Sequence, residues 1–219
     1  MSLIDKLFGR TRAAPPPVSG VATSMPLGLR MGGRVHFDRM MYRVAPRALS
    51  AELPAGDQGI ECYGHIDLGD GCVMHRFYLE DDAYLQVMTV GQSVESIKAF
   101  VFHETVNPPT LAAFREFVAS HPHLGADAVD YAGRRWSRVT SPEGGQKIPP
   151  MAFDEVLYRG VPPRRDDSLT HYAMVYARDV PQLEREELLL VTAEDSGPNQ
   201  YCVTYAIGLD LSEADLDIT

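Results

Sequence analysis

Two cysteine–histidine pairs are the residues whose types and spacing most resemble a metal site. Cys62 and His65 lie three residues apart, and Cys72 and His75 repeat that spacing ten residues later. Thiolate and imidazole are the ligands that tetrahedral Zn²⁺ takes in structural sites. Zinc binding would require all four side chains to converge, so the strands that carry them decide whether the site can form.

The strand pattern between the two pairs predicts a hairpin. Asp70-Gly71 is a strong signal for a two-residue type I′ turn between alternating strands. A turn at this dipeptide places Ile66 opposite His75. That register brings the apolar residues of both strands to one face, as a half-buried sheet requires.

This register divides the four candidate ligands between the two faces of the sheet. Cys62 and His75 would face the core, while His65 would lie opposite Arg76 on the outer face and Cys72 would also point outward. We therefore predict a buried Cys62, a core-side His75 and a surface His65, and no zinc site.

A second metal candidate and one nucleophile candidate fit their patterns poorly. His121 and His123, with Asp127 and Asp130 downstream, follow no dedicated metal-ligand spacing. These histidines come after a predicted helix, where their charge suits the C-terminal dipole. Residues 91–95 (GQSVE) fail the G-x-S-x-G nucleophile pattern at the last position. We predict no metal ligand and no catalytic nucleophile in either segment.

The remaining polar clusters are best interpreted as structural. The acidic run 80–82 lies between two predicted strands and is typical of a solvated turn. Arg134, Trp136 and Arg138 would share one face of a strand, where they could hold an anion or pack as a cation–π group, and the packing role is favoured. No Gly-rich phosphate loop precedes a helix. We predict no cofactor and assign no catalytic residue.

Apolar residues alternate along many short segments, which predicts an α+β, β-rich protein with mostly antiparallel strands. The expected strands are 34–37, 41–44, 59–68, 72–79, 83–90, 96–102, 129–131, 135–140, 151–158, 170–178, 187–193 and 201–209. Asn107, followed by two prolines, predicts the start of the main helix at about 107–120. This helix should cover the apolar face of a sheet.

Three parts are expected along the chain. Residues 1–26 read as a short amphipathic helix and a Pro-rich linker, 27–125 as a first β-rich half that includes the main helix, and 126–219 as a second β-rich half. A relation between the halves is suggested by the predicted hairpins 35–44 and 129–140, which resemble each other. Duplication and chance likeness both remain open, and duplication would place both hairpins in equivalent positions.

Composition excludes several classes of protein. The chain has 219 residues, of which 45% are apolar and 23% charged, with a net charge of −10. An acidic balance argues against nucleic-acid binding, which needs a basic face. No apolar run reaches the length of a membrane span, and no secretory signal is recognisable. Three cysteines are typical of reduced thiols in the cytoplasm.

Charge is distributed unevenly, and the basic end carries the candidate contact residues. Residues 1–47 hold eight Lys or Arg and two Asp, a net of +6, whereas 48–219 carry −16. The first twelve residues combine one apolar helix face with positive charge. The residues that would contact a partner or a membrane are Leu3, Ile4, Lys6, Leu7, Phe8, Arg10 and Arg12.

Three roles for this N-terminal segment remain open. A weak, reversible contact with an anionic bilayer would suit its basic and apolar residues. A groove on a protein partner would suit them equally well. The segment could also remain unbound or pack on its own domain.

Several segments together resemble the YjfK-like family of uncharacterised bacterial proteins. These segments are 26–35 (PLGLRMGGRV), 77–87 (FYLEDDAYLQV), 133–136 (GRRW), 174–179 (MVYARD) and 187–191 (ELLLV). The resemblance covers most of the chain and implies a β-rich cytosolic protein without known catalytic residues. It also implies an accessory role near relatives of the membrane-stress protein PspA.

These observations favour a non-enzymatic cytoplasmic adaptor, in envelope or membrane stress if the resemblance holds. A protein partner is expected, with a PspA-like protein as the candidate that the resemblance suggests, and the adaptor could lie peripheral to the inner membrane. The alternative is an enzyme or small-ligand binder with a cleft between the two halves, where shifted pKa values and convergent polar groups would be found.

Overall fold

β-strands dominate residues 25–139 and 145–219, which the computed structural model describes. The first strands are β1 (Arg34–Phe37), β2 (Gln58–Gly69), β3 (Cys72–Leu79), β4 (Ala83–Val90) and β5 (Ser93–Val106). The later strands are β6 (Ala128–Tyr131), β7 (Arg134–Arg138), β8 (Met151–Arg159), β9 (Arg164–Val180), β10 (Arg185–Asp195), β11 (Tyr201–Leu211) and β12 (Leu216–Ile218). The helical elements are α2 (Met40–Val44), α3 (Leu111–Ser120) and the 3-10 turns η1 (Pro26–Gly28), η2 (Pro181–Leu183) and η3 (Glu213–Asp215).

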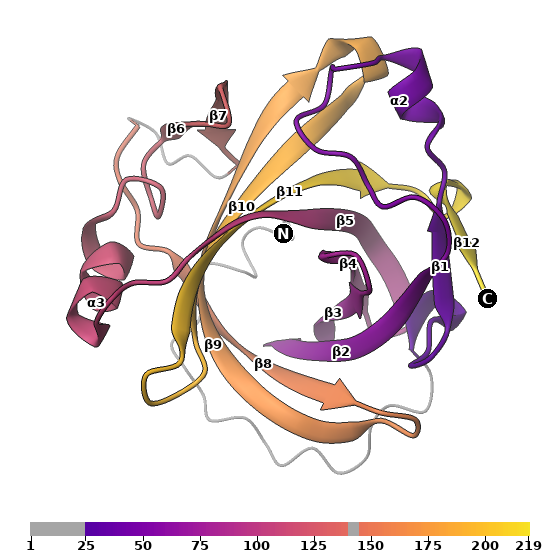
Figure 1. Ribbon diagram of the computed structural model, residues 1–219, viewed down its shortest axis with the longest axis horizontal. Helices are drawn as coiled ribbons and strands as arrows, with labels where there is room; N and C mark the ends of the chain where they lie inside the picture. The colour runs from indigo at the N-terminus through magenta and orange to yellow at the C-terminus, as the bar shows by residue number, and fades with distance from the viewer. Residues whose placement is uncertain (1–24, 140–144) are drawn as a thin grey trace.

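Eight strands close into one antiparallel barrel. Their order is β2–β3–β4–β5–β11–β10–β9–β8, and β8 pairs back onto β2, so the ring in Figure 1 is complete. β2–β5 and β8–β11 are consecutive meanders, joined where β5 pairs with β11 and β8 with β2. The predicted β-rich, mostly antiparallel fold with one main helix is confirmed. The structure does not show two halves, because both meanders contribute to one barrel.

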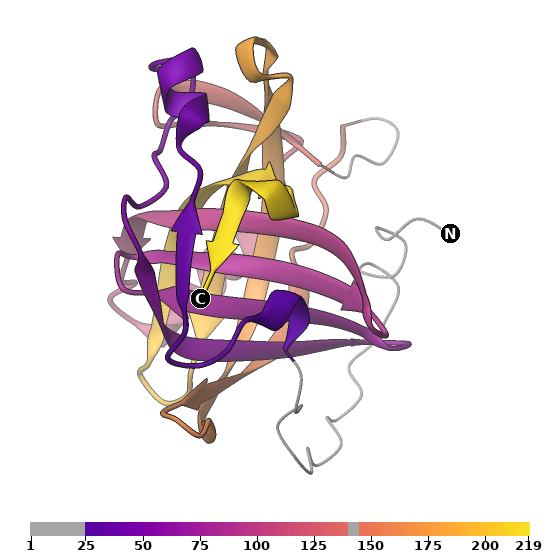
Figure 2. The same cartoon turned by 90° about the vertical axis from the view of Figure 1, so that its right-hand side faces the viewer.

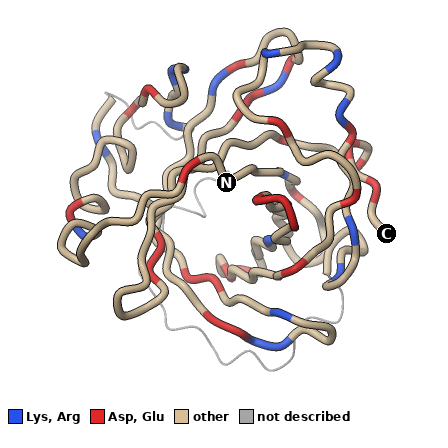
Figure 3. The backbone as a smooth tube through the Cα atoms, in the orientation of Figure 1, with Lys and Arg blue, Asp and Glu red and all other residues tan. Residues whose placement is uncertain are grey.

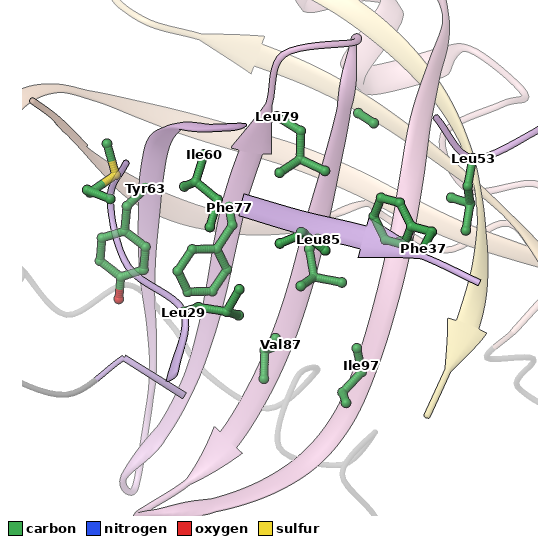
Figure 4. Packing of buried hydrophobic residues seen from close by; sticks show 14 of the residues in the cluster. Leu29, Phe37, Leu53, Ile60, Tyr63, Phe77, Leu79, Leu85, Val87 and Ile97 are labelled. Atoms are coloured by element: carbon green, nitrogen blue, oxygen red, sulfur yellow. The ribbon is translucent and has the colours of Figure 1, made fainter. Parts of the chain in front are cut away.

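Two layers cover the outside of the barrel. β1 and β12 pair with each other and cross the outer face of β2–β5 (Figure 2). Phe37 of β1 belongs there to one buried apolar cluster with Phe77, Leu85 and Ile97 of the barrel (Figure 4). On the other side, α3 and the β6–β7 hairpin cover β9, β10 and β11, with Trp136 fully buried beneath them.

Side chains of opposite strands meet inside the barrel. Tyr84 and Phe100, from β4 and β5, belong to one apolar cluster with Ala173 and Leu188 of β9 and β10. This cluster also includes Ala206 of β11 and, partly buried, Phe153 of β8, so it draws side chains from most strands of the barrel. The barrel is therefore filled by its own side chains, as small barrels usually are.

The predicted strand at 41–44 is wrong, because this segment is the helix α2. The Asp38 carboxylate accepts a hydrogen bond from Met40 N at 2.8 Å, which starts a helical turn. The Tyr42 hydroxyl accepts one from Leu53 N at 2.7 Å, which fixes the helix on the following loop. β1 therefore has no hairpin partner in this segment and pairs with β2 and β12 instead. Residues 35–44 therefore do not form a hairpin equivalent to β6–β7, as duplication would have required.

The main helix covers a sheet face, as predicted, but begins later than Asn107. α3 starts after Thr110, whose hydroxyl accepts a hydrogen bond from Ala113 N at 3.1 Å. Pro109 disfavours helical geometry at the residue before it, so Asn107 cannot cap a helix that continues through this dipeptide. Phe114 anchors α3 in the layer over β10 and β11.

Candidate functional site

Charged side chains meet inside the barrel. Arg76 of β3, Glu155 of β8 and His171 of β9 expose 3%, 0% and 1% of their surface. Arg76 Nη1 lies 3.1 Å from Glu155 Oε2, and His171 Nε2 lies 2.6 Å from the same oxygen. Tyr78 of β3 donates its hydroxyl to Glu155 Oε1 at 3.0 Å. We call Arg76, Tyr78, Glu155 and His171 the interior cluster.

Neighbouring strands leave room for these groups and hold them in place. Gly64 of β2 faces Glu155, and a Cβ atom at Gly64 would lie 1.7 Å from Glu155 Oε1. The Arg76 guanidinium lies 5.3 Å from the ring centre of Tyr84 and 5.5 Å from that of Phe153. Cation–π contacts of this kind stabilise a buried cation. The interior therefore fits the ion pair closely.

The electrostatics of the cluster keep the ion pair charged. Burial alone would raise the pKa of Glu155, but Arg76, His171 and Tyr78 outweigh it and hold that pKa below its ordinary value. Burial likewise disfavours the Arg76 cation, but Glu155 reverses the effect and raises the pKa of Arg76. Both oxygens of Glu155 already accept hydrogen bonds within the cluster. Glu155 is therefore a structural counter-ion and not a free general base.

A second polar group lies where the interior reaches solvent. Glu194 of β10 is partly exposed, and its Oε1 lies 4.0 Å from His171 Nδ1, a buried atom without a hydrogen-bond partner. Glu194 also accepts hydrogen bonds from the Thr204 hydroxyl at 2.9 Å and the Cys202 thiol at 3.7 Å. Burial, and next Glu194, raise the pKa of Cys202 to about 12. Cys202 is therefore a protonated thiol and a poor nucleophile near neutral pH.

Sequence reasoning missed the interior cluster. Arg76 was predicted on the outer face opposite His65, but it points into the barrel. Glu155 and His171 are in phase with apolar residues that face the interior, such as Phe153. A polar residue in the buried phase of a strand was the available signal, but closure of the barrel was needed to bring these residues together.

The predicted Asp70-Gly71 turn is confirmed, but the register beyond it is wrong. Asp70 and Gly71 have φ values of 54° and 75°, as a type I′ turn requires. The register shifts between Asp67 and Gly69. Ile66 therefore lies opposite Met74 and not opposite His75. One extra residue in a strand moves every later side chain to the other face.

This register shift changes which of the four cysteine and histidine side chains lie on each face of the sheet. Cys62 and Cys72 point into the barrel, where they expose 3% and 1% of their surface, so the predicted outward Cys72 is wrong. His65 and His75 lie opposite each other on the outer face. His75 is buried there, as predicted, and its Nδ1 lies 2.7 Å from the Tyr63 hydroxyl. His65 is more exposed than Cys62, as predicted.

The other sequence candidates also have structural surroundings. Within residues 25–139 and 145–219, no three His, Cys, Asp or Glu side chains are arranged to hold a metal ion. His121 and His123 contact aromatic rings instead. The cation over Trp136 is Arg178, 5.5 Å from the ring centre, and Arg138 donates to the Gly125 carbonyl.

One hollow lies outside the barrel, beside α3. It is an open groove of about 480 Å³. Its lining is mostly apolar and consists of Val118, Ala119, Lys147, Ile148, Pro149, Pro150, Ala152 and Tyr172. A second hollow, of about 10 Å³, lies under the loop that follows α2. No residue of the interior cluster lines either hollow.

The predicted contact residues at positions 3–12 lie outside the described residues. Within the described part, several Lys and Arg positions lie on and near α2, while acidic positions are spread around the barrel (Figure 3). No described helix is both long and apolar enough to cross a membrane.

The fold and the interior cluster define a class: a closed, filled β-barrel in which a buried ion pair is structural. Residues 3–217 match a family described as "Protein of unknown function (DUF2491)", and the chain belongs to this family. It is 27% identical over 200 residues to "Uncharacterized protein YjfK" of Escherichia coli (strain K12), which covers 88% of this chain and 90% of that protein. The predicted family resemblance is confirmed. No solved structure matches the chain.

Proposed function

We propose that the protein is a non-enzymatic adaptor of the cytoplasm. The observation that carries this proposal is the filled barrel interior, in which Arg76, Glu155 and Tyr78 bond to one another. Such an interior supports a scaffold, because a substrate would have to displace a buried ion pair to reach these groups. The adaptor would therefore bind its partner with the segments outside the barrel.

The N-terminal segment is the part that we assign to partner binding. Its apolar residues, such as Leu7 and Phe8, recur at helical spacing and are flanked by Lys6 and Arg10. An apolar face with positive neighbours fits a groove on another protein. We propose a PspA-like membrane-stress protein as the partner to test first, and a role in the response to envelope stress, because the family resemblance supports both.

Affinity capture from cells tests this assignment. The full chain is compared with a variant that carries Leu7→Asp and Phe8→Asp, which removes half of the apolar face. A matched control carries Ser19→Asp and Thr23→Asp and adds the same charge to the linker. The proposal expects one partner to be recovered with the wild type and the control but not with the variant. Equal recovery with all three proteins would refute it.

Contact with the inner membrane is a separable part of the proposal. Lys6, Arg10 and Arg12 would each contribute about 1 kcal/mol near an anionic surface, and Asp5 would subtract a similar amount. This gives weak, salt-sensitive attachment. Co-sedimentation with anionic vesicles should fall at high salt and should be lost with Leu7→Asp and Phe8→Asp. Pelleting of that variant with the vesicles to the wild-type extent would exclude the membrane contact and leave the partner proposal standing.

An enzyme or small-ligand binder is the alternative, and one observation favours it. His171 Nδ1 is buried without a partner near Glu194 and Cys202, where a small polar ligand could bond. The cleft predicted between the two halves has less support, because the pairs β5–β11 and β2–β8 join both parts of the chain into one sheet.

A further inference from the structure

Five aromatic rings form a continuous series outside the barrel, between α3 and β6. His121 stacks on Phe117 at 4.0 Å between ring centres, with 13° between the planes. His123 meets His121 edge-on at 4.8 Å, and its Nδ1 lies 3.1 Å from the Tyr205 hydroxyl. Tyr205 of β11 stacks on Tyr131 of β6 at 4.7 Å. We call Phe117, His121, His123, Tyr131 and Tyr205 the latch.

One hydrogen bond in the latch depends on a neutral imidazole. The backbone N–H of His123 donates to His121 Nδ1 at 3.2 Å. A backbone N–H can only donate, so His121 Nδ1 must be unprotonated to accept. A proton on that nitrogen would set two donors against each other and remove this bond, which weakens the turn that follows α3.

The charged and titratable groups around the two histidines come from five other parts of the chain. They are Lys147 from the segment before β8, His103 and Glu104 of β5, Tyr131 of β6, Tyr176 of β9 and Tyr205 of β11. Glu104 acts on His123, whereas the charges that act on His121 are those of Lys147 and His123. The surroundings of His121 therefore oppose a positive charge.

The pKa values agree with this geometry. Burial, then His123 and Lys147, lower the pKa of His121 from its ordinary 6.5. Burial lowers the pKa of His123 as well, although Glu104 partly offsets it. When docking lowers the pKa of a base, that base stabilises the docked state at pH values above its ordinary pKa. This contribution is lost as the pH falls below that value. Burial and Glu104 raise the pKa of Tyr205 to about 12, so its hydroxyl stays protonated at both pH values.

Besides the latch, α3 is attached by its one buried residue and by Lys147 Nζ, which donates to the Ala119 carbonyl at 3.3 Å. Phe114 is the buried residue of α3, and Phe117 and Val118 are only partly buried. Beyond the helix, the Tyr176 hydroxyl donates to the His123 carbonyl at 3.1 Å. Loss of the turn at His121 would release the end of α3 from β11 while the strand pairs of the barrel remain.

We propose that protonation of His121 opens the latch and releases α3 from the barrel, so that pH controls the docking of this helix. Release would uncover apolar residues of the outer layer, including Val118 and Ile148 beside the groove. This device goes beyond the adaptor proposal and does not depend on which partner the protein binds.

Hydrogen–deuterium exchange of the full chain tests the device. Protection of the α3 amides is compared at pH 7.5 and 5.5, after correction for the intrinsic pH dependence of exchange. The β4 amides of Leu85–Met88 report whether the barrel stays folded. Protection of α3 should fall by up to about tenfold, because pH 5.5 lies one unit below the ordinary pKa of His121, while β4 is unchanged.

Two variants of His121 and one control separate the device from general acid sensitivity. His121→Asn retains an acceptor near the Nδ1 position and cannot titrate, so its α3 protection should not change with pH. His121→Lys carries a permanent charge, so α3 should exchange rapidly even at pH 7.5. His36→Asn removes a histidine of β1, far along the sheet from the latch, and should respond as the wild type does.

Three results would overturn the proposal. The first is wild-type α3 protection that is the same at both pH values. The second is an equal fall in His121→Asn. The third is normal protection of α3 in His121→Lys at pH 7.5 while β4 remains protected.

Discussion

Replacement of Glu155 by Gln should destabilise the barrel strongly, although the side chain keeps its size and one acceptor oxygen. Arg76 would remain buried, exposing 3% of its surface, without the carboxylate that lies 3.1 Å from its Nη1. Removing one partner of a buried ion pair costs about 3–5 kcal/mol, because the other charge stays buried and uncompensated. We expect a loss of this size in the free energy of unfolding.

The matched control is Asp166→Asn, in the exposed pair that Asp166 forms with Arg159 at 2.9 Å. Both side chains of this pair are at least half exposed, so the same carboxylate-to-amide change should cost about 0–1 kcal/mol. Urea-induced unfolding can be followed by the fluorescence of Trp136, the single tryptophan of the chain, which is fully buried. A double variant, Arg76→Met with Glu155→Leu, should recover much of the lost stability.

The pH dependence gives an independent check. The pKa of Glu155 is lowered in the folded protein, so its contribution is present above the unfolded value of about 4.3 and is lost as the pH falls through the folded value. The stability difference between wild type and Glu155→Gln should therefore narrow below about pH 4. Glu155→Gln within about 1 kcal/mol of Asp166→Asn at pH 7 would refute the buried ion pair.

Three further predictions test single contacts. Gly64→Ala should lower the free energy of unfolding by about 1–3 kcal/mol in the same urea assay, because its Cβ would lie 1.7 Å from Glu155 Oε1; wild-type stability would contradict this packing. Thr110→Ala should cost about 0.5–2 kcal/mol through loss of the α3 cap, while Thr110→Ser should retain it. With its pKa raised to about 12, Cys202 should hold roughly a thousandfold less thiolate at pH 8 than an ordinary thiol. It should therefore react slowly with iodoacetamide, and Glu194→Gln should accelerate the reaction. Ordinary reactivity measured by mass spectrometry would show that this thiol is not held protonated.

Individual strands and tight turns were predictable, because alternation of apolar residues and the residue types of a turn depend only on neighbouring positions. The strands at 72–79 and 83–90 were predicted with the bounds that β3 and β4 have. The Asp70-Gly71 turn was also predictable, because few residue pairs adopt two positive φ values. The bulge near Leu68 was not predictable. The register between β2 and β3 depends on which elements pack on each face of the sheet, and neighbouring residues do not carry that information.

The closure of the barrel and the interior cluster could not be predicted from the pattern of neighbouring residues. Arg76 and Glu155 are 79 residues apart, and they meet only because β8 pairs with both β2 and β9. Apolar residues occur in both phases of β3, with Met74 and Tyr78 in the phase of Arg76 and Phe77 in the other. Alternation alone could therefore not assign the face of Arg76. The helix α2 was missed because its start depends on a side-chain bond from Asp38 and its position on a contact with Leu53.

The central claim is that the barrel is a scaffold and that binding lies at the N-terminal segment. One quantitative capture experiment compares the wild type, the Leu7→Asp and Phe8→Asp variant, and Glu194→Gln, which alters the polar group beside the interior cluster. We predict that Glu194→Gln recovers the partner to the wild-type extent and that the N-terminal variant does not. Loss of the partner with Glu194→Gln, together with its recovery by the N-terminal variant, would contradict the claim and place the functional site in the barrel.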